Sequence, residues 1–263
     1  MGKTKAILGV NLAALAMSLA MTWAFVGRMQ LGVLGSAYVA TCTDLVTVLL
    51  LIAVACADPE VRRCWTGFSR GALRGWGPYL RLAVPAAVMC LAEWAAWDAA
   101  FILAGLVRPD PAGALAAQSL LQNVLGLPYL ASYALYRGTG TLVGNALGAS
   151  DPTGARRAAI VGLTMCAVIT ALQCAALVAG RRAWGRLFGA EPSLGPVVAG
   201  LMPWLAVFAF ADSIQMTLTG VISGAGKQPA TSAVLVAAYW CIGLPLGVLL
   251  GFGYPASGLL GIW

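Results

Sequence analysis

Four acidic residues stand inside long apolar stretches of this sequence: Asp44, Glu93, Asp98 and Asp212. A charged side chain at the centre of a membrane-spanning helix costs about 2.5–3.5 kcal/mol on insertion scales, and such residues are functional by default. No Lys or Arg stands in the middle of these stretches, so the sequence offers no evident ion-pair partner. We therefore interpret the acids as a candidate binding site, with local pairing or capping as the structural alternative. For Asp44 the neighbouring threonines would suffice as local partners.

The segment around residue 95 combines carboxylates with indoles, as Glu93, Trp94, Trp97 and Asp98. In a helix, residues four apart share a face, so Glu93 lies beside Trp97, and Trp94 beside Asp98. A carboxylate next to an aromatic face suits an organic cation, through its charge and through cation–π attraction. A carboxylate removed from water also holds a proton more readily than one in water. A proton and a cation can then compete for one group, which is the chemistry of a coupled transporter.

The amino-acid composition indicates whether these acids lie in a soluble protein or in a membrane protein. Of the 263 residues, 60% are hydrophobic and 10% are charged, which is too apolar for one soluble core and typical of an integral membrane protein. The chain has no histidine, which excludes His-based catalytic triads, metal sites and proton relays, and we expect no enzyme activity. The formal charge of +7 is attributed to arginines that flank membrane spans rather than to nucleic-acid binding.

A membrane-spanning helix needs about 20 mainly apolar residues, and seven full stretches of this kind can be read from the sequence. They are residues 7–27, 34–57, 79–106, 113–142, 155–179, 196–222 and 231–252. The first also resembles a signal peptide, but it lacks a clean cleavage site and we expect a retained helix. An eighth stretch begins near Gly258 and is cut off at Trp263, so we expect the sequence to be a fragment. The predicted fold is an all-α, polytopic helical bundle in a lipid bilayer.

Residues 58–78 form the longest polar linker and separate two spans from the remainder of the chain. This linker is rich in arginine, and cytoplasmic loops carry an excess of Lys and Arg. The linker is therefore expected to be cytoplasmic, which places the N-terminus in the cytoplasm as well. Linkers of this kind join the repeated helical bundles of many transporters.

Four ordered motifs resemble those of the multidrug and toxic compound extrusion (MATE) family, in its eukaryotic branch. The first is Glu93-Trp94 followed by Asp98, which is similar to the hallmark of the family's seventh helix. The others are residues 142–149, which resemble the motif between helices eight and nine, residues 210–226, which resemble helix ten, and residues 238–247, which resemble helix eleven. The resemblance covers nearly the whole chain and is strongest from about residue 79 onward.

The resemblance implies a twelve-helix antiporter of two six-helix lobes, which expels organic cations and other xenobiotics against protons. In that frame, residues 1–57 are the last two helices of a truncated N-terminal lobe, and residues 79–263 are a C-terminal lobe truncated in its last helix. Glu93 and Asp212 correspond to the carboxylates that bind proton and substrate, and Asp98 to a second acid of helix seven. The resemblance further includes Trp94, Trp97 and Tyr239 in the site.

The partners implied are small organic cations, the lipid bilayer and the missing N-terminal helices, with H⁺ as coupling ion and no cofactor. Two alternatives stay open at this point. One is a flippase for lipid-linked oligosaccharides, which would be expected to line its cavity with basic groups. The other is a truncated fragment that does not transport. The sequence does not distinguish the plasma membrane from a vacuolar or other organelle membrane.

Overall fold

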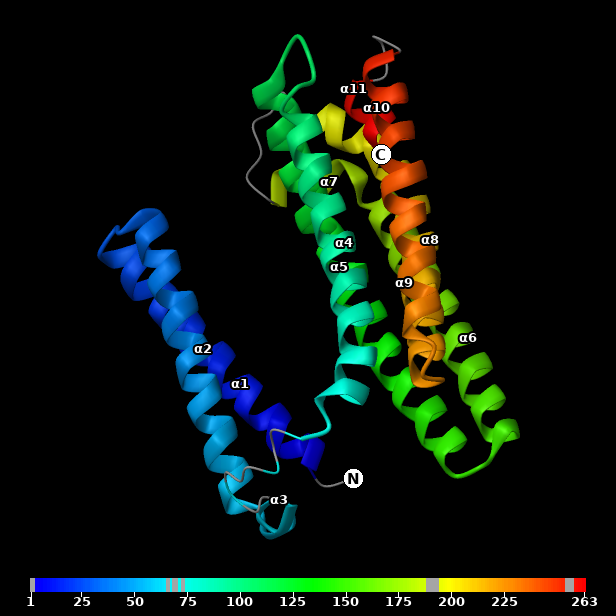
Figure 1. Ribbon diagram of the computed structural model, residues 1–263. Helices are drawn as coiled ribbons and strands as arrows, with labels where there is room; N and C mark the ends of the chain where they lie inside the picture. The colour runs from blue at the N-terminus through cyan, green and yellow to red at the C-terminus, as the bar shows by residue number, and fades with distance from the viewer. Residues whose placement is uncertain (1–2, 65–66, 68–70, 72–73, 188–193, 254–257) are drawn as a thin grey trace. The chain divides into compact units, whose positions relative to one another are not determined.

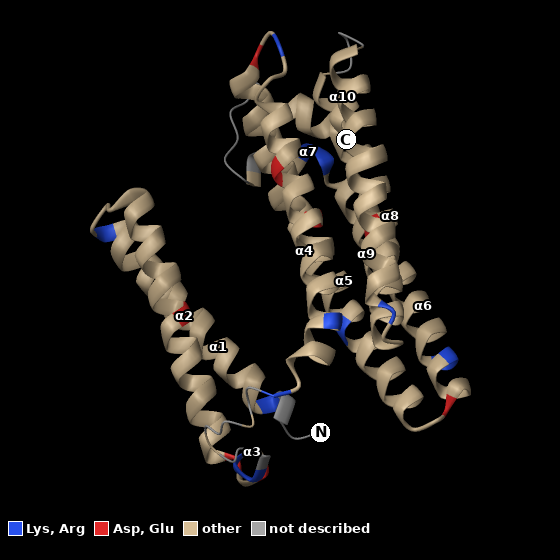
Figure 2. Ribbon diagram, viewed as in Figure 1, with Lys and Arg blue, Asp and Glu red and all other residues tan. Residues whose placement is uncertain are grey.

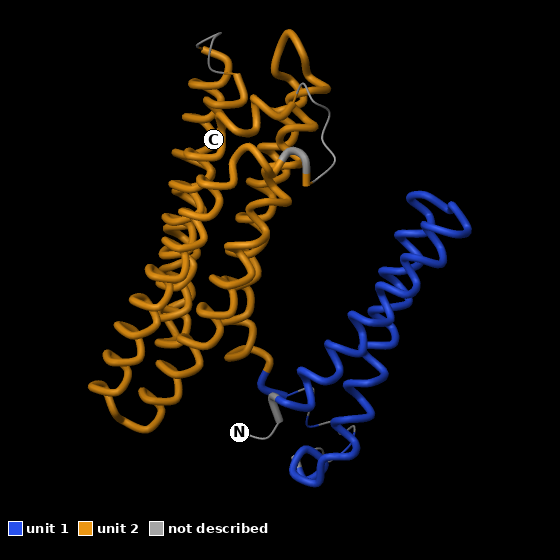
Figure 3. The backbone as a smooth tube through the Cα atoms, turned by 180° about the vertical axis from the view of Figure 1, so that it is seen from behind, with its two compact units in different colours: residues 1–75 blue, residues 76–263 orange. Residues whose placement is uncertain are grey.

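The computed structural model describes residues 3–64, 67, 71, 74–187, 194–253 and 258–263 (Figure 1). Within these ranges the regular secondary structure is entirely helical, with no β-strand. The predicted all-α class is thereby confirmed. The chain separates into two compact units, residues 1–75 and residues 76–263 (Figure 3).

The first unit is a helical hairpin built from two long helices. Its elements are α1 (Lys3–Thr22), the π-helical segment η1 (Trp23–Arg28), α2 (Gly32–Ala57) and the short α3 (Pro59–Cys64). Two residues with positive φ, Gln30 and Gly32, lie in the turn where the chain reverses between η1 and α2. Asp44 lies on α2 and is exposed in this unit.

The second unit is a bundle in which long helices run beside one another (Figure 1). Its elements are α4 (Trp76–Ala104), α5 (Pro111–Gly148), α6 (Pro152–Ala179), α7 (Arg181–Leu187), α8 (Leu194–Gly224), α9 (Gln228–Val236), the π-helical segment η3 (Ala237–Gly243), α10 (Leu244–Gly253) and α11 (Gly258–Ile262). The segments α9, η3 and α10 follow one another without a break and together form the span expected at residues 231–252.

Six helices in the described part of the chain are long and apolar enough to cross a membrane, which agrees with a polytopic membrane protein. The expected span at residues 113–142 also forms a helix, α5, which has 38 residues but is more polar than those six. Its polar side chains Gln118, Ser132 and Thr139 are buried among neighbouring helices. Polar groups in the bilayer are tolerated where protein covers them, and α5 is the central helix of the bundle. Most Lys and Arg residues lie in loops or near helix ends (Figure 2).

The starts of α5 and α6 are encoded locally by the same pair of residues. Asp110 and Asp151 precede prolines that open the two helices, and each carboxylate accepts a hydrogen bond from the backbone N–H three residues later, at 2.9 and 2.8 Å. Aspartate at the N-cap satisfies an otherwise unpaired helical N–H, and proline is favoured in the first turn because its missing N–H is not needed there. These two caps fix where α5 and α6 begin.

The bundle core forms where α5 meets α6 and α8. The Ser132 hydroxyl of α5 donates a hydrogen bond of 2.7 Å to the Ser213 hydroxyl of α8. The thiol of Cys166 on α6 donates to the Ser213 carbonyl oxygen at 3.2 Å. Three helices therefore meet at Ser213, one residue from Asp212, which holds that part of α8 in place.

The helical segments α9 and η3 pack against α4 through two hydrogen bonds between distant parts of the chain. The Ser232 hydroxyl donates to the Pro85 carbonyl oxygen at 2.6 Å. The Trp240 indole N–H donates to the Ala92 carbonyl oxygen at 3.1 Å. The second bond joins the residue after Tyr239 to the residue before Glu93, so it brings these two predicted site residues to neighbouring elements.

Candidate functional site

A cavity of about 250 Å³ lies between α4, α5 and α8, and it is called the carboxylate cavity here. Its lining residues are Glu93, Trp94, Trp97, Gln122, Leu125, Gly126, Tyr129 and Asp212. It contains both acids for which the sequence motifs imply proton and substrate binding. The two are separated by more than a hundred positions in the sequence, and the packing of α4 and α8 about α5 brings them to one cavity.

The two carboxylates line the same cavity, so their negative charges repel each other when both are ionised. Both side chains are half-buried. The Tyr239 side chain lies near the Asp212 carboxylate. Tyr239 lies in η3, and π-helical turns often occur at functional sites because they change the direction of side chains within a helix. The arrangement favours a bound positive charge, which would reduce the repulsion between the two acids.

Aromatic rings form much of the wall around the carboxylates. The indoles of Trp94 and Trp97 come from α4, and the Tyr129 ring comes from α5. Among the described residues that line this cavity there is neither Lys nor Arg. Carboxylates without a basic partner, next to aromatic faces, are the groups expected of a site for an organic cation.

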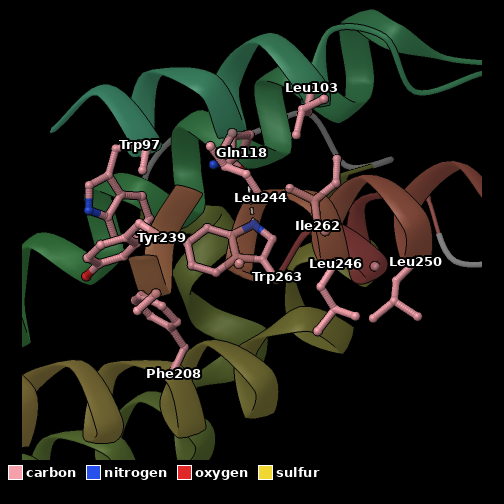
Figure 4. A pocket seen from close by; sticks show the side chains of 16 residues that line it. Trp97, Leu103, Gln118, Phe208, Tyr239, Leu244, Leu246, Leu250, Ile262 and Trp263 are labelled. Atoms are coloured by element: carbon pink, nitrogen blue, oxygen red, sulfur yellow. Dashed lines mark hydrogen bonds between the residues drawn. The ribbon is translucent and has the colours of Figure 1, made fainter. Parts of the chain in front are cut away.

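A second cavity of about 370 Å³ adjoins the first and is called the aromatic chamber here. Trp97 lines both cavities, and Tyr239 lines the chamber and lies near Asp212 of the carboxylate cavity. Figure 4 shows Trp97, Phe208 and Trp263 around the chamber, with leucines of α10 on another side. Gln118 of α5 is the polar residue at its wall nearest to Trp263 (Figure 4).

The structure does not bring all predicted residues into these cavities. Asp98 is exposed on α4 and lines neither cavity. Trp94 lines the carboxylate cavity but is 56% exposed. Glu93 and Asp98 are five positions apart, which in an α-helix of 3.6 residues per turn separates their directions by about 140°. A single cavity beside α4 therefore accommodates Glu93 and leaves Asp98 outside.

We expect the Asp98→Asn variant to keep most of the affinity of the protein for an organic cation. The reason is that the side chain lies outside both cavities, so its charge acts on a bound cation only from a distance. Equilibrium dialysis of tetraethylammonium against the protein in lipid nanodiscs measures the change. We expect less than a threefold loss. A loss as large as that of Glu93→Gln in the same assay would place Asp98 in the site and contradict the expectation.

The structure adds residues that the sequence motifs did not identify. Gln118, Gln122 and Tyr129 of α5 line one cavity or the other, and Phe208 of α8 lines the chamber. Spacings of four and seven positions place the three α5 residues on one helix face. Polar residues repeated on one face of an apolar span are a detectable signal of a lined cavity. Phe208 gave no comparable signal, because a single aromatic residue in an apolar span is ordinary.

Comparison with known proteins shows the family. The family model described as MatE matches residues 85–249. Protein DETOXIFICATION 16 of Arabidopsis thaliana is 33% identical over 242 residues, which cover 92% of this chain and 49% of that protein. Multidrug and toxin extrusion protein 2 of Homo sapiens is 32% identical over 242 residues, which cover 92% of this chain and 39% of that protein. The chain thus spans about half the length, or less, of these curated relatives.

The fold agrees with this family. The crystal structure of the eukaryotic MATE transporter AtDTX14 superposes with a TM-score of 0.87 at 25% identity, covering 96% of this chain and 57% of that one. A crystal structure of a MATE protein in the bent conformation matches with a TM-score of 0.76 at 16% identity, covering 97% of this chain and 56% of that one, which supports the fold alone. The family model covers more than half of the residues of this chain. This integral membrane chain therefore belongs to the MatE family.

Proposed function

We propose that this chain forms the ion-coupled part of an antiporter that exports organic cations in exchange for protons, with Glu93 and Asp212 as the exchanging carboxylates. The observation that carries the proposal is the carboxylate cavity, where two acids from different helices meet aromatic rings with no basic residue among the described lining. The names of the relatives from Homo sapiens and Oryctolagus cuniculus, multidrug and toxin extrusion proteins, support the same class of activity.

The proposed exchange is a competition for negative charge. On the cytoplasmic side, deprotonated Glu93 and Asp212 attract the cation, whose charge also interacts with the indole faces. On the opposite side, protonation neutralises the carboxylates and the cation dissociates. Competition of proton and cation for one pair of groups couples their movements when the site opens to the two sides of the membrane in turn, by alternating access.

The proposal includes the arrangement in the membrane. Residues 1–57 correspond to the last two helices of one lobe, residues 58–78 to a cytoplasmic linker and residues 79–263 to the second lobe. The N-terminus is proposed to be cytoplasmic, in the plasma membrane or an organelle membrane. Partner helices equivalent to the remainder of the first lobe would complete the transporter. A flippase for pyrophosphate-linked sugars does not fit the carboxylate cavity, because acids without basic partners repel a pyrophosphate.

The proposed function is tested with the protein and the partner helices proposed above, reconstituted together in liposomes that have an acidic lumen in neutral buffer. We expect radiolabelled tetraethylammonium to accumulate several-fold above protein-free liposomes, because protons leaving the lumen drive the cation inward. Nigericin, which dissipates the proton gradient, should remove this accumulation. The proposal is wrong if the liposomes with protein take up no more cation than those without it, or if uptake is insensitive to nigericin.

A further inference from the structure

The aromatic chamber adjoins the carboxylate cavity but differs from it in chemistry. We propose that it binds a neutral, flat aromatic group that carries a hydrogen-bond acceptor such as a ring carbonyl, and that Gln118 donates the hydrogen bond. The inference rests on the proposed function only in assigning this group to the transported molecule, which would then be a cation with an aryl-carbonyl part. Binding to the chamber itself is testable without transport.

The walls of the chamber are suited to a flat ring. Trp97 and Phe208 meet edge to face, with ring centroids 5.3 Å apart and an angle of 88° between the planes. Phe208 and Trp263 meet in the same manner at 5.7 Å and 86°. Such mutually perpendicular rings offer both faces and edges to a further ring. The volume of about 370 Å³ is within the range of about 300–1,000 Å³ that is typical of ligand pockets.

Gln118 supplies the specific polar contact. Its side chain is fully buried, with 0% exposure. The Trp263 indole N–H donates a hydrogen bond of 2.7 Å to Gln118 Oε1 (Figure 4). Because an indole N–H can only donate, this bond fixes which amide atom is the oxygen, and it leaves the Nε2 donors on the other branch. Gln118 Nε2 is buried and has no hydrogen-bond partner among the described residues.

An unpaired buried N–H₂ group is costly, so a ligand acceptor that reaches it recovers a hydrogen bond that the empty site lacks. A ligand donor would gain less there, because Oε1 already accepts a hydrogen bond from Trp263, whereas Nε2 has no partner among the described residues. The described residues that line the chamber include no charged side chain, which argues for a neutral group. Trp97 lines both cavities, so a single molecule could place its cationic end beside Glu93 and its ring carbonyl in the chamber.

The test compares two ligands of similar size and shape that differ in the acceptor. Coumarin has two fused rings and a ring carbonyl, whereas naphthalene has two fused rings and no acceptor. Saturation-transfer NMR with the protein in lipid nanodiscs measures both affinities, and empty nanodiscs correct for partition into lipid. We expect coumarin to bind about fivefold to tenfold more tightly than naphthalene, the advantage of one net hydrogen bond.

The key variant is Gln118→Met, which keeps the length of the side chain and removes both amide groups. We expect it to bind coumarin and naphthalene equally. The matched control is Asn123→Leu on the same helix, which removes an exposed amide that lines neither cavity, and it should keep the preference for coumarin. If Gln118→Met does not fold, Gln118→Asn retracts the amide by one methylene and should reduce the preference.

Equal affinities of the unmodified protein for the two ligands, or absence of binding by both, would overturn the inference. A preference that persists in a folded Gln118→Met variant would overturn it as well. The Glu93→Gln variant separates this inference from the proposed function. That variant should lose affinity for tetraethylammonium and keep its preference for coumarin, because Glu93 lines only the carboxylate cavity.

Discussion

Replacing Glu93 by glutamine is expected to weaken the binding of tetraethylammonium at neutral pH at least tenfold. The substitution keeps the size of the side chain and removes one of the two negative charges of the carboxylate cavity. Interactions with a charged partner are worth roughly 1.5–3 kcal/mol, which corresponds to a loss of about tenfold to a hundredfold. The half-buried position of Glu93 limits the compensation that water could offer.

The pH dependence of binding provides a second readout of the same variant. In the unmodified protein the affinity for the cation should fall as the medium is acidified, because a proton bound to a carboxylate removes the charge that attracts the cation. In Glu93→Gln this fall should be smaller, since one of the competing groups no longer titrates. Asp212→Asn should act in the same direction. Equilibrium dialysis in nanodiscs over a series of pH values measures both effects.

The matched control is Asp44→Asn, which removes another carboxylate from an apolar helix. Asp44 lies on α2 in the first unit, is exposed, and lines neither cavity. Its substitution should leave the affinity and its pH dependence within about twofold of the unmodified protein, as for an exposed charge that lines neither cavity. If Glu93→Gln binds the cation as the control does, Glu93 is not the binding carboxylate.

The Gly220→Val substitution is expected to lower the free energy of unfolding of the second unit by about 1–3 kcal/mol, as for other overpacked cores. Gly220 lies where α8 crosses α5, and a Cβ atom at this position would meet the Tyr136 carbonyl oxygen of α5. A Cβ atom at Gly140 would lie 2.8 Å from the Gly220 carbonyl oxygen. The two backbones are thus in direct contact, and a side chain at either glycine must force the helices apart.

The sequence at this crossing explains the close approach. Gly140 and Gly144 on α5 are four residues apart, and so are Gly220 and Gly224 on α8. Small residues at this spacing let helix backbones pack closely in a membrane, where dispersion contacts and hydrogen bonds replace the hydrophobic effect as the driving force. Moving α8 would also displace Asp212, two helical turns earlier, so Gly220→Val should weaken cation binding in addition.

The thermal unfolding midpoint of the protein in detergent measures the loss of stability. The control is Gly200→Val on the same helix, where an added Cβ atom has no neighbour within 4 Å. It applies the same change in helix propensity without the clash. Gly220→Val should unfold at a clearly lower temperature than Gly200→Val. Equal midpoints for the two variants would show that the α5–α8 contact is looser than described.

The sequence by itself determined the class of the protein and the local chemistry of its site. Apolar stretches of about 20 residues specify membrane helices because lipid leaves the backbone no other way to satisfy its hydrogen bonds. Asp110 and Asp151 mark the first turns of α5 and α6 through caps that depend only on adjacent residues. The four-residue spacing of Glu93 and Trp97 placed them on one helix face, and both line the carboxylate cavity.

Only the tertiary structure decided which residues face one another. Helical periodicity says that Glu93 and Asp98 point in different directions, but the packing of α5 and α8 against α4 selects Glu93 for the cavity and leaves Asp98 exposed. The contact of Tyr239 with Asp212 depends on η3, whose π-helical turn has no reliable sequence signal. In the sequence, Gln118 is only a polar residue within a span. In the structure, the Trp263 indole, 145 positions later, donates a hydrogen bond to its oxygen, and its nitrogen has no partner among the described residues. Contacts between distant residues depend on the crossing of whole helices, and short-range patterns do not encode that crossing.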